Sequence, residues 1–333
     1  MIKLVKNNPF LLKPAAKNYI WGGTRLNDEF CKKINMDKVA ETWECSTHKD
    51  GNSIVFGGYY NGMRLTDVLK KHPEFMGKNI YNKLGELPVL IKIIDAQSDL
   101  SIQVHPDDEY AKNKENGSLG KDEMWYILDC EQNSSIVYGF YNDVKKDELE
   151  NSISNGTIEK YLQRVYVNKG DIFYIPAGCV HAIGRGNLIV EIQENSNITY
   201  RLYDYNRIDA NGRKRKLNIQ KALEVINLSE TALPRQHLSV IQFRNGYATE
   251  LLCKCRYFEV QRILLNTERC RKMASINSII ESFQVLLCID GCGVMFGCDN
   301  FSLSFFKGDC IFIPADCGEF RIHGKGELLK VRC

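Results

Sequence analysis

Short apolar runs separated by Gly, Pro and Asn make up most of this chain of 333 residues. Runs such as LPVLIKIIDA (87–96), EMWYILDC (123–130) and NLIVEIQENS (187–196) are rich in β-branched and aromatic residues, which predicts β-strands. The same pattern predicts further strands at 51–60, 100–105, 171–178, 257–265, 283–291, 293–297, 303–308, 310–314 and 328–333. The chain is therefore expected to be mainly β.

Helical patterns are fewer than strand patterns. Apolar residues recur at helical spacing in three segments, which cover residues 64–84, 143–164 and 218–229. The last of them, together with the polar segment around 208–217, predicts a link between two β-rich halves.

One phrase is written twice along the chain. NKGDIFYIPAGCVH runs from Asn168 to His181, and FKGDCIFIPADCGE runs from Phe306 to Glu319. In each copy Gly-Asp predicts a turn, the apolar stretch a strand, and the Pro-Ala segment a second turn. The separation is too long for a solenoid, so two related antiparallel jelly-roll (cupin) domains explain it better.

We therefore expect two cupin domains with a few inserted and linking helices. The predicted boundaries place an N-terminal catalytic domain with helical insertions over 1–207, a helical linker over 208–240, and a C-terminal domain over 241–333.

Polar side chains share one face of a predicted strand in the first domain. Side chains two residues apart on a strand point the same way, so Ser101, Gln103 and His105 lie on one side and the opposite side is apolar. By the same rule Lys121 and Glu123 share a face of the next strand. A hairpin between the two strands would place Glu123 beside His105.

His181 follows the Pro-Ala-Gly turn at the predicted start of a strand. With His105, Glu123 and an amide oxygen it makes a four- or five-coordinate nitrogen and oxygen site, which suits zinc, while iron or manganese fits the same ligand types. The second copy of the phrase has Glu319 in place of His181. We therefore expect the C-terminal domain to keep the scaffold but to lack the metal ligands.

Charge and cysteine content narrow the class of protein. A net charge of +3 is too balanced for a nucleic-acid binder, and the basic segment 212–216 is expected to be a solvated loop. The sequence has no apolar run long enough to span a membrane, and its first residues argue against a signal peptide, so we expect none. Its 13 cysteines, an odd number without a Cys-x-x-Cys motif, predict free thiols in a reducing cytoplasm, most of them small buried hydrophobic residues.

Six motifs in order resemble type I mannose-6-phosphate isomerase, in its short bacterial form. The resemblance covers residues 1 to about 230, and its motifs are YIWGGTRL (19–26), AETWECSTHKDG (40–51), LSIQVHPDDEYA (100–111), GKDEMWYILD (120–129), GDIFYIPAGCVHAIGRG (170–186) and IVEIQENSNITYRLYDYNR (189–207). We expect Glu41, Trp43 and His48, within the second motif, to serve in packing.

The resemblance implies a zinc-dependent aldose–ketose isomerase that interconverts mannose 6-phosphate and fructose 6-phosphate through a cis-enediol. It implies one zinc ion per chain and a sugar phosphate as substrate, with no nucleic-acid or membrane partner, and we expect a monomer. The implied metal ligands are Gln103, His105, Glu123 and His181, although Gln103 could instead contact a ligand without binding the metal itself.

The resemblance also implies the remaining site residues. Glu191 corresponds to the proton-transfer base and Arg201 to the catalytic arginine of the family. The positions that face the substrate phosphate are Lys92, Ser101, Lys121 and Arg207, the last replacing a lysine of longer relatives.

Two other classes remain open at this point. The chain could be another metal-dependent cupin enzyme, such as a sugar epimerase or an iron dioxygenase, or a sugar-phosphate-binding cupin without activity. The presence of Glu191 and Arg201 beside a full ligand set favours an enzyme, because a binding module does not need them.

Overall fold

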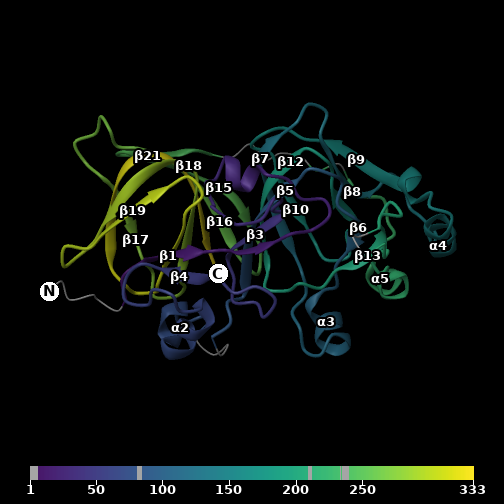
Figure 1. The fold of residues 1–333 in the computed structure, drawn as a ribbon, viewed down its shortest axis with the longest axis horizontal. Coiled ribbons are helices and arrows are strands. Elements are labelled where there is room, and N and C mark those ends of the chain that lie inside the picture. Colours follow the sequence, from purple (N-terminus) through teal and green to yellow (C-terminus); the bar gives the residue numbers. More distant parts are fainter. Residues whose placement is uncertain (1–6, 81–84, 209–211, 233, 235–239) are drawn as a thin grey trace.

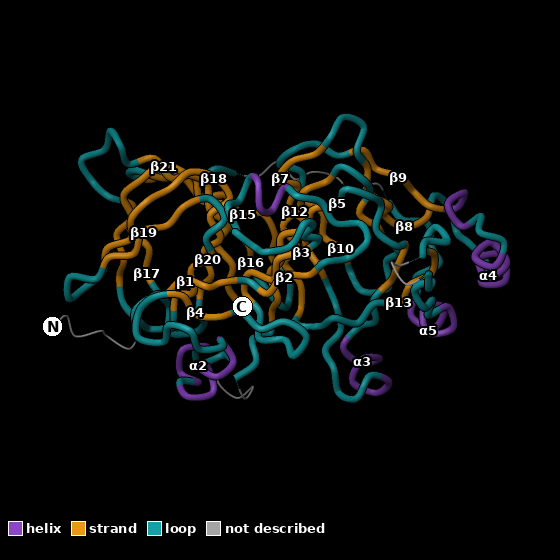
Figure 2. The backbone as a smooth tube through the Cα atoms, viewed as in Figure 1, coloured by secondary structure: helices purple, strands orange, loops and turns teal. Residues whose placement is uncertain are grey.

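The computed structural model describes residues 7–80, 85–208, 212–232, 234 and 240–333. Two β-rich lobes lie side by side, one built from the middle of the chain and one mainly from its C-terminal third (Figure 1). Helices lie at the periphery of both lobes, and strands fill the interior (Figure 2). The prediction of a mainly β chain is confirmed.

Three antiparallel sheets organise these lobes. The central sheet has the order β10 (Ile172–Ile175), β7 (Glu123–Cys130), β12 (Asn187–Glu194), β5 (Val89–Ala96), β3 (Glu41–Cys45) and β2 (Ala15–Lys17). The small sheet has the order β13 (Tyr200–Tyr203), β6 (Ile102–Val104), β11 (His181–Ile183), β8 (Ser135–Phe140) and β9 (Leu162–Tyr166).

The third sheet, here called the C-terminal sheet, has ten strands. Its main path is β14 (Gln242–Arg244), β15 (Tyr247–Lys254), β16 (Glu259–Asn266), β21 (Glu319–Arg332), β18 (Gln284–Phe296), β20 (Cys310–Ile313), β1 (Phe10–Lys13) and β4 (Ile54–Phe56). Strands β17 (Ala274–Asn277) and β19 (Ser302–Phe306) pair with β21 and β18.

Alternation along the central sheet sorts its side chains into two environments. On β5, Val89, Ile91 and Ile93 pack in one hydrophobic cluster with Val285 and Leu287 of the C-terminal sheet. The alternate residues of β5 point instead toward the small sheet. Because both faces are covered, every residue of β5 is buried, which explains its nearly continuous apolar sequence.

The repeated phrase folds the same way in both lobes. Asp171 accepts a hydrogen bond from the backbone N–H of Asn168 at 2.8 Å, and Asp309 accepts one from Phe306 at the same distance. In the second turn, Gly178 and its counterpart Asp316 both have positive φ, at 83° and 55°. Local sequence therefore specifies both turns independently of the rest of the lobe.

The C-terminal lobe has an apolar interior at the place where the first lobe carries its polar residues. Buried side chains that include Met295, Phe305 and Phe320 fill it. Glu319, which corresponds to His181, is exposed and accepts a hydrogen bond from Ser275 at 2.7 Å. This geometry supports the expectation that the second lobe is scaffold.

Strands β1 and β4, from the first part of the chain, join the C-terminal sheet. Residues Phe10 to Leu12 of β1 pair with Cys310 to Phe312 of β20, and the rings of Phe10 and Phe312 stack at 5.3 Å. Pairing of β1 protects an otherwise free edge of β20. The boundaries 1–207, 208–240 and 241–333 remain a prediction. The pairing of β1 with β20 shows that the C-terminal sheet includes a strand from the N-terminal end of the chain.

The helices are shorter than the predicted segments. The first predicted helix is only α2 (Leu65–Lys71), followed by the 3₁₀ turn η1 (Pro73–Met76), because Pro73 cannot continue an α-helix. The second is α4 (Lys146–Ser154) and η2 (Ile158–Tyr161), and the third is α5 (Ile219–Val225). Residues 81–84 of the first prediction lie outside the described residues.

Two helices were not predicted. They are the one-turn α1 (Arg25–Asp28) and α3 (Asp108–Lys114). Asp107 caps α3 by accepting a hydrogen bond from the backbone N–H of Tyr110 at 2.8 Å. The run Pro-Asp-Asp-Glu at 106–109 was the signal for this helix start.

All 13 cysteines are described, and none of them forms a disulfide bond. Only four are buried, which makes the expectation of mostly buried cysteines too strong: Cys31, Cys270, Cys292 and Cys298 are exposed. Among the described residues no helix has the length and apolar character needed to cross a bilayer.

We predict that Ile91→Ala destabilises the whole protein, because Ile91 is fully buried between the central and C-terminal sheets. The free energy of unfolding should fall by about 2–5 kcal/mol in urea denaturation. Leu251→Ala, on a side chain 48% exposed, should change it by less than about 1 kcal/mol. Equal losses in the two variants would contradict the assignment of this interface as core.

Candidate metal centre and active site

Three predicted ligands converge between the central and small sheets. A ligand atom from each of His105, Glu123 and His181 lies within 4.8 Å of the others, and all three residues are buried. His105 follows β6, Glu123 begins β7 and His181 begins β11. The expected hairpin between His105 and Glu123 is wrong, since α3 separates their strands and the two residues belong to different sheets.

Hydrogen bonding orients the His181 ring. Its Nδ1 lies 2.9 Å from the carbonyl oxygen of Cys179, which can only accept a hydrogen bond. Nδ1 therefore carries the proton, and the lone pair of Nε2 faces the centre of the cluster. That Nε2 lies 3.1 Å from Nε2 of His105 and 3.7 Å from Oε2 of Glu123.

Burial sets the protonation states of the cluster. Burial and the nearby ammonium of Lys121 lower the pKa of His105 to about 3, and burial also lowers the pKa of His181. Burial alone would raise the pKa of Glu123, but Lys121 and the histidines outweigh it and hold the pKa well below its usual value. At neutral pH the set is two neutral imidazoles and one carboxylate.

These residues fit a cation. Among the described residues, Oε2 of Glu123 is a buried atom with no hydrogen-bond partner. Two imidazole nitrogens and a carboxylate facing one another repel unless a positive charge lies between them. Neutral imidazole and carboxylate are also the forms that bind divalent metals.

Gln103 lies at the edge of the cluster. Its Nε2 is 3.3 Å from Nε2 of His181, the residue opposite it in the sheet. Rotation of the terminal amide by half a turn would present the oxygen instead. The geometry therefore leaves both roles of Gln103 open, ligand or neighbour of a ligand.

Glu191 and Lys92 form a buried ion pair in the wall of the site. Nζ of Lys92 lies 2.8 Å from Oε1 of Glu191 and 3.9 Å from Oε2 of Glu41. Burial opposes the charge of Lys92, yet the two carboxylates raise its pKa above the ordinary value. Lys92 therefore stays charged.

The second predicted phosphate lysine is also paired. Lys121 is 3% exposed and hydrogen-bonds Glu123, and its Nζ lies 3.2 Å from Nε2 of His105. The structure thus places both Lys92 and Lys121 among carboxylates inside the site.

Arg201 lies opposite Gln103 in the small sheet. Its Nε donates to Oγ of Ser101 at 3.1 Å and its Nη1 to the carbonyl oxygen of Lys216 at 3.3 Å. Burial and the positive charge of Arg215 lower the pKa of Arg201. Among these contacts no carboxylate is bound directly to its guanidinium.

Two further arginines share one carboxylate beside Arg201. Arg207 and Arg215 both bond Asp204, which is 6% exposed, and Arg207 also donates to the carbonyl oxygen of Asp99. Burial would raise the pKa of Asp204, but the two guanidinium groups lower it. Three guanidinium groups beside one carboxylate leave an excess of positive charge.

The basic segment 212–216 corrects one sequence expectation. Arg213, Lys214 and Lys216 are exposed, as a solvated loop requires. Arg215 instead turns inward to Asp204, and the Lys216 carbonyl contacts Arg201. Only the tertiary structure supplies these partners.

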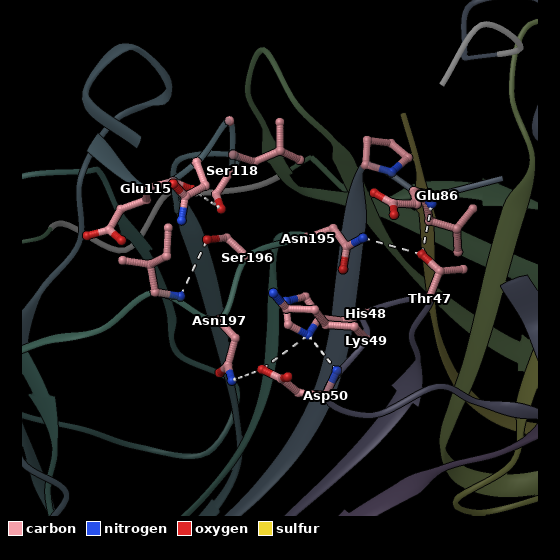
Figure 3. A pocket seen from close by; sticks show the side chains of 16 residues that line it. Thr47, His48, Lys49, Asp50, Glu86, Glu115, Ser118, Asn195, Ser196 and Asn197 are labelled. Carbon is pink, nitrogen blue, oxygen red and sulfur yellow. Dashed lines mark hydrogen bonds and ion pairs between the residues drawn. The ribbon is translucent and has the colours of Figure 1, made fainter. Parts of the chain in front are cut away.

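A polar cleft of about 730 Å³ is lined by residues that include His48, Glu115 and Asn195. Figure 3 shows Asn195 reaching toward Thr47, while His48 and Asn197 both meet Asp50. The His48 ring packs edge-on against Trp43 at 5.7 Å, and burial lowers the pKa of His48.

The charges of the cleft differ from those around Arg201. Its lining carries the ammonium group of Lys49 and three carboxylates, from Asp50, Glu86 and Glu115. Such a lining attracts hydroxyl groups rather than anions.

Sequence reasoning missed Glu41, Trp43 and Arg215. Nε1 of Trp43 donates to Oε2 of Glu41 at 2.7 Å, and both side chains face Lys92. Glu41 and Trp43 stand two apart on a strand, the same parity signal that identified Gln103 and His105. For Arg215 the sequence carries no comparable signal.

Comparison with known proteins identifies the family. A family model described as the catalytic domain of phosphomannose isomerase type I matches residues 10–132. Another, described as the cupin domain of mannose-6-phosphate isomerase, matches residues 248–333. The chain is 39% identical over 321 residues to mannose-6-phosphate isomerase ManA of Bacillus subtilis, covering 96% of this chain and 98% of that protein. The chain belongs to the type I mannose-6-phosphate isomerase family.

Other members of the type I mannose-6-phosphate isomerase family are also similar. The Streptococcus mutans mannose-6-phosphate isomerase is 37% identical over 254 residues, covering 76% of this chain and 78% of that protein. The crystal structure of the mannose 6-phosphate isomerase from Bacillus subtilis matches with a TM-score of 0.88 at 34% identity, covering 97% of this chain and 99% of that one. The family resemblance and the cupin fold expected from sequence are confirmed.

A more distant match shares the fold. It is a mannose 6-phosphate isomerase crystallised with zinc and yttrium, with a TM-score of 0.74 and 18% identity, covering 97% of this chain and 99% of that one.

We predict that His181→Ala abolishes metal binding, because the site loses one of three convergent ligands. Metal analysis of the purified protein should fall to background. His323→Ala, a matched change in the second lobe where His323 contacts Thr267, should keep its metal, and Glu319→His should gain none. Full metal content in His181→Ala would refute the site.

Acid should destabilise the metal-free protein through His105. Its folded pKa, about 3, lies below the ordinary 6.5, so the unfolded chain takes up the proton first as pH falls below 6.5. Between pH 6.5 and 5 this imidazole alone should cost about 2 kcal/mol of unfolding free energy. Urea denaturation of chelator-treated protein should show a shallower pH dependence in His105→Asn, and identical slopes would contradict the assignment.

Proposed function

We propose that this chain is a zinc-dependent isomerase that interconverts mannose 6-phosphate and fructose 6-phosphate. Relatives named for this activity match the chain over nearly their whole length. The observation that carries the proposal is the metal-ready cluster of His105, Glu123 and His181. Trp125 links this cluster to the buried Glu191, and Arg201 lies opposite Gln103 in the small sheet.

His105, Glu123 and His181 would hold one zinc ion, with Gln103 as a fourth ligand or a neighbour. Two neutral imidazoles and a carboxylate are a ligand set that suits zinc. When bound, the metal supplies Lewis-acid polarisation of the substrate oxygens.

Charge orients the substrate between the two ends of the site. The excess positive charge around Arg201, Arg207 and Arg215 attracts the phosphate, and Ser101 adds a hydroxyl there. The carboxylate-rich cleft beside His48 repels phosphate and accepts the uncharged hydroxyl groups of the sugar. The sequence predicted Lys92 and Lys121 at the phosphate. In the site they form ion pairs with Glu191 and Glu123, beside the proposed metal and proton carrier.

Glu191 would carry the proton between the two sugar carbons. It takes the C2 proton of the open-chain aldose; the C–H electrons form the C1=C2 double bond, and the carbonyl π electrons move to O1. The proton of the O2 hydroxyl passes to O1, so that C2 becomes the carbonyl carbon while the carboxylic acid returns its proton to C1 and gives the ketose. Lys92 hydrogen-bonds the carboxylate, and Arg201 would stabilise negative charge on the sugar oxygens.

The expected setting is the reducing cytoplasm. Four thiols are exposed, and an oxidising compartment would pair or modify such groups. The monomeric state stays a prediction from the sequence.

The direct test is an isomerase assay on mannose 6-phosphate with and without a chelator. Arg201→Ala should fold and keep its metal but lose about 100- to 1000-fold in kcat, because it lacks the charge that stabilises the transition state. Arg64→Ala, a surface change on a side chain 65% exposed, serves as control and should be fully active.

Three results would each overturn a different part of this assignment. Normal turnover by Arg201→Ala would refute its role. Chelator-resistant activity would refute the role of the metal. Metal-loaded protein without isomerase activity would favour a sugar-phosphate-binding cupin.

A further inference from the structure

One row of four side chains crosses the central sheet beside the metal cluster. Trp43 on β3 lies opposite Lys92 on β5, Lys92 opposite Glu191 on β12, and Glu191 opposite Trp125 on β7. Neighbouring strands stand about 4.8 Å apart, and paired residues point to the same face. All four are at most 4% exposed, so their polar atoms must satisfy one another.

Glu191 is held from both sides within this row. Its Oε1 accepts a hydrogen bond from Nζ of Lys92 at 2.8 Å, and its Oε2 accepts one from Nε1 of Trp125 at 3.1 Å. Two donors on different oxygens fix both the position and the plane of the carboxylate. The indole N–H does not titrate and can only donate, so its bond persists whatever charge Lys92 carries.

Trp125 also touches the metal cluster. Its ring meets His181 edge-on, with centroids 5.5 Å apart and planes at 75°. Trp125 is fully buried, and its partner on the other neighbouring strand, β10, is Phe173, which is 2% exposed. The indole therefore has no room to turn, and one rigid side chain sets the separation between Glu191 and His181.

A second tryptophan–carboxylate pair, between Trp43 of the row and Glu41, offers a comparison. Nε1 of Trp43 donates to Glu41 at 2.7 Å, and Glu41 lies 3.9 Å from Lys92. The Trp43 ring faces His48 and the polar cleft. Of the two pairs, only Trp125 with Glu191 has a contact with a metal ligand among the described residues, through the ring of His181.

We propose that Trp125 is a positioning residue for the isomerisation. Its N–H holds the Glu191 carboxylate in the orientation that reaches the substrate carbons, and its ring edge fixes that carboxylate relative to His181. This inference rests on the proposed function, since it concerns the residue assigned there as the proton carrier.

The first test is Trp125→Phe, which removes the N–H but keeps a flat ring against His181. Metal content and KM should stay unchanged while kcat falls roughly 10-fold or more, because a misplaced base affects the chemical step alone. In a Glu191→Gln background the same change should cost nothing further, since Trp125 acts through Glu191. An unchanged kcat, or the same loss in both backgrounds, would overturn the proposal.

A second measurement does not depend on activity. The chain has three tryptophans, so its ¹H–¹⁵N spectrum contains three indole N–H resonances, and the one missing from Trp125→Phe identifies Trp125. Glu191→Gln should shift that resonance, whereas Glu41→Gln should shift the resonance of Trp43. An unshifted Trp125 resonance in Glu191→Gln would show that the hydrogen bond is absent.

The two tests separate this inference from the proposed function. If the native protein does not isomerise mannose 6-phosphate, the proposed function fails while the spectrum still tests the bond. If Glu191→Gln is fully active, the proton-carrier role fails, and the positioning role fails with it. If Glu191→Gln is inactive and Trp125→Phe is normal, only the positioning role is lost.

Discussion

The central sheet is buried on both faces, and the rest of the structure depends on this constraint. One face of β5, β7 and β12 packs its aliphatic side chains against the C-terminal sheet, and that contact forms the largest described core. The other face packs against the small sheet, with a second apolar cluster and buried charged side chains between them. A charged side chain on that second face has no bulk water to solvate it, so it must find a partner there.

On the face of the central sheet that looks toward the small sheet, and around it, charged side chains pair with groups of opposite charge. Lys92 bonds Glu191, Lys121 bonds Glu123, and Arg215 and Arg207 share Asp204. Two places on this face can still take a ligand. The unpartnered Oε2 of Glu123 and the Nε2 atoms of the two histidines can bind a cation. The guanidinium of Arg201, which has no carboxylate among its described contacts, can bind an anion. The proposed metal and phosphorylated substrate would occupy these two places.

Comparison of the two lobes separates what makes the fold from what makes the chemistry. The Asp171 and Asp309 turns share their backbone hydrogen bonds and positive-φ positions, so the repeated phrase encodes scaffold. The second lobe fills its interior with aromatic side chains and exposes Glu319. An apolar interior gains stability from burial that a polar site gives up for function.

Sequence alone determined the strands and the shared faces of Gln103 with His105 and of Lys121 with Glu123, because these follow from local periodicity. It also determined the family, because the motifs that mark the family are local. It did not determine which strands face each other. The predicted hairpin between His105 and Glu123 became a contact between two sheets, and β1 crossed to the other lobe. Tertiary structure also decided the partners of Lys92, Trp125 and Arg215, because hydrogen bonds between residues 11 to 99 positions apart depend on how the chain folds back and leave no local pattern.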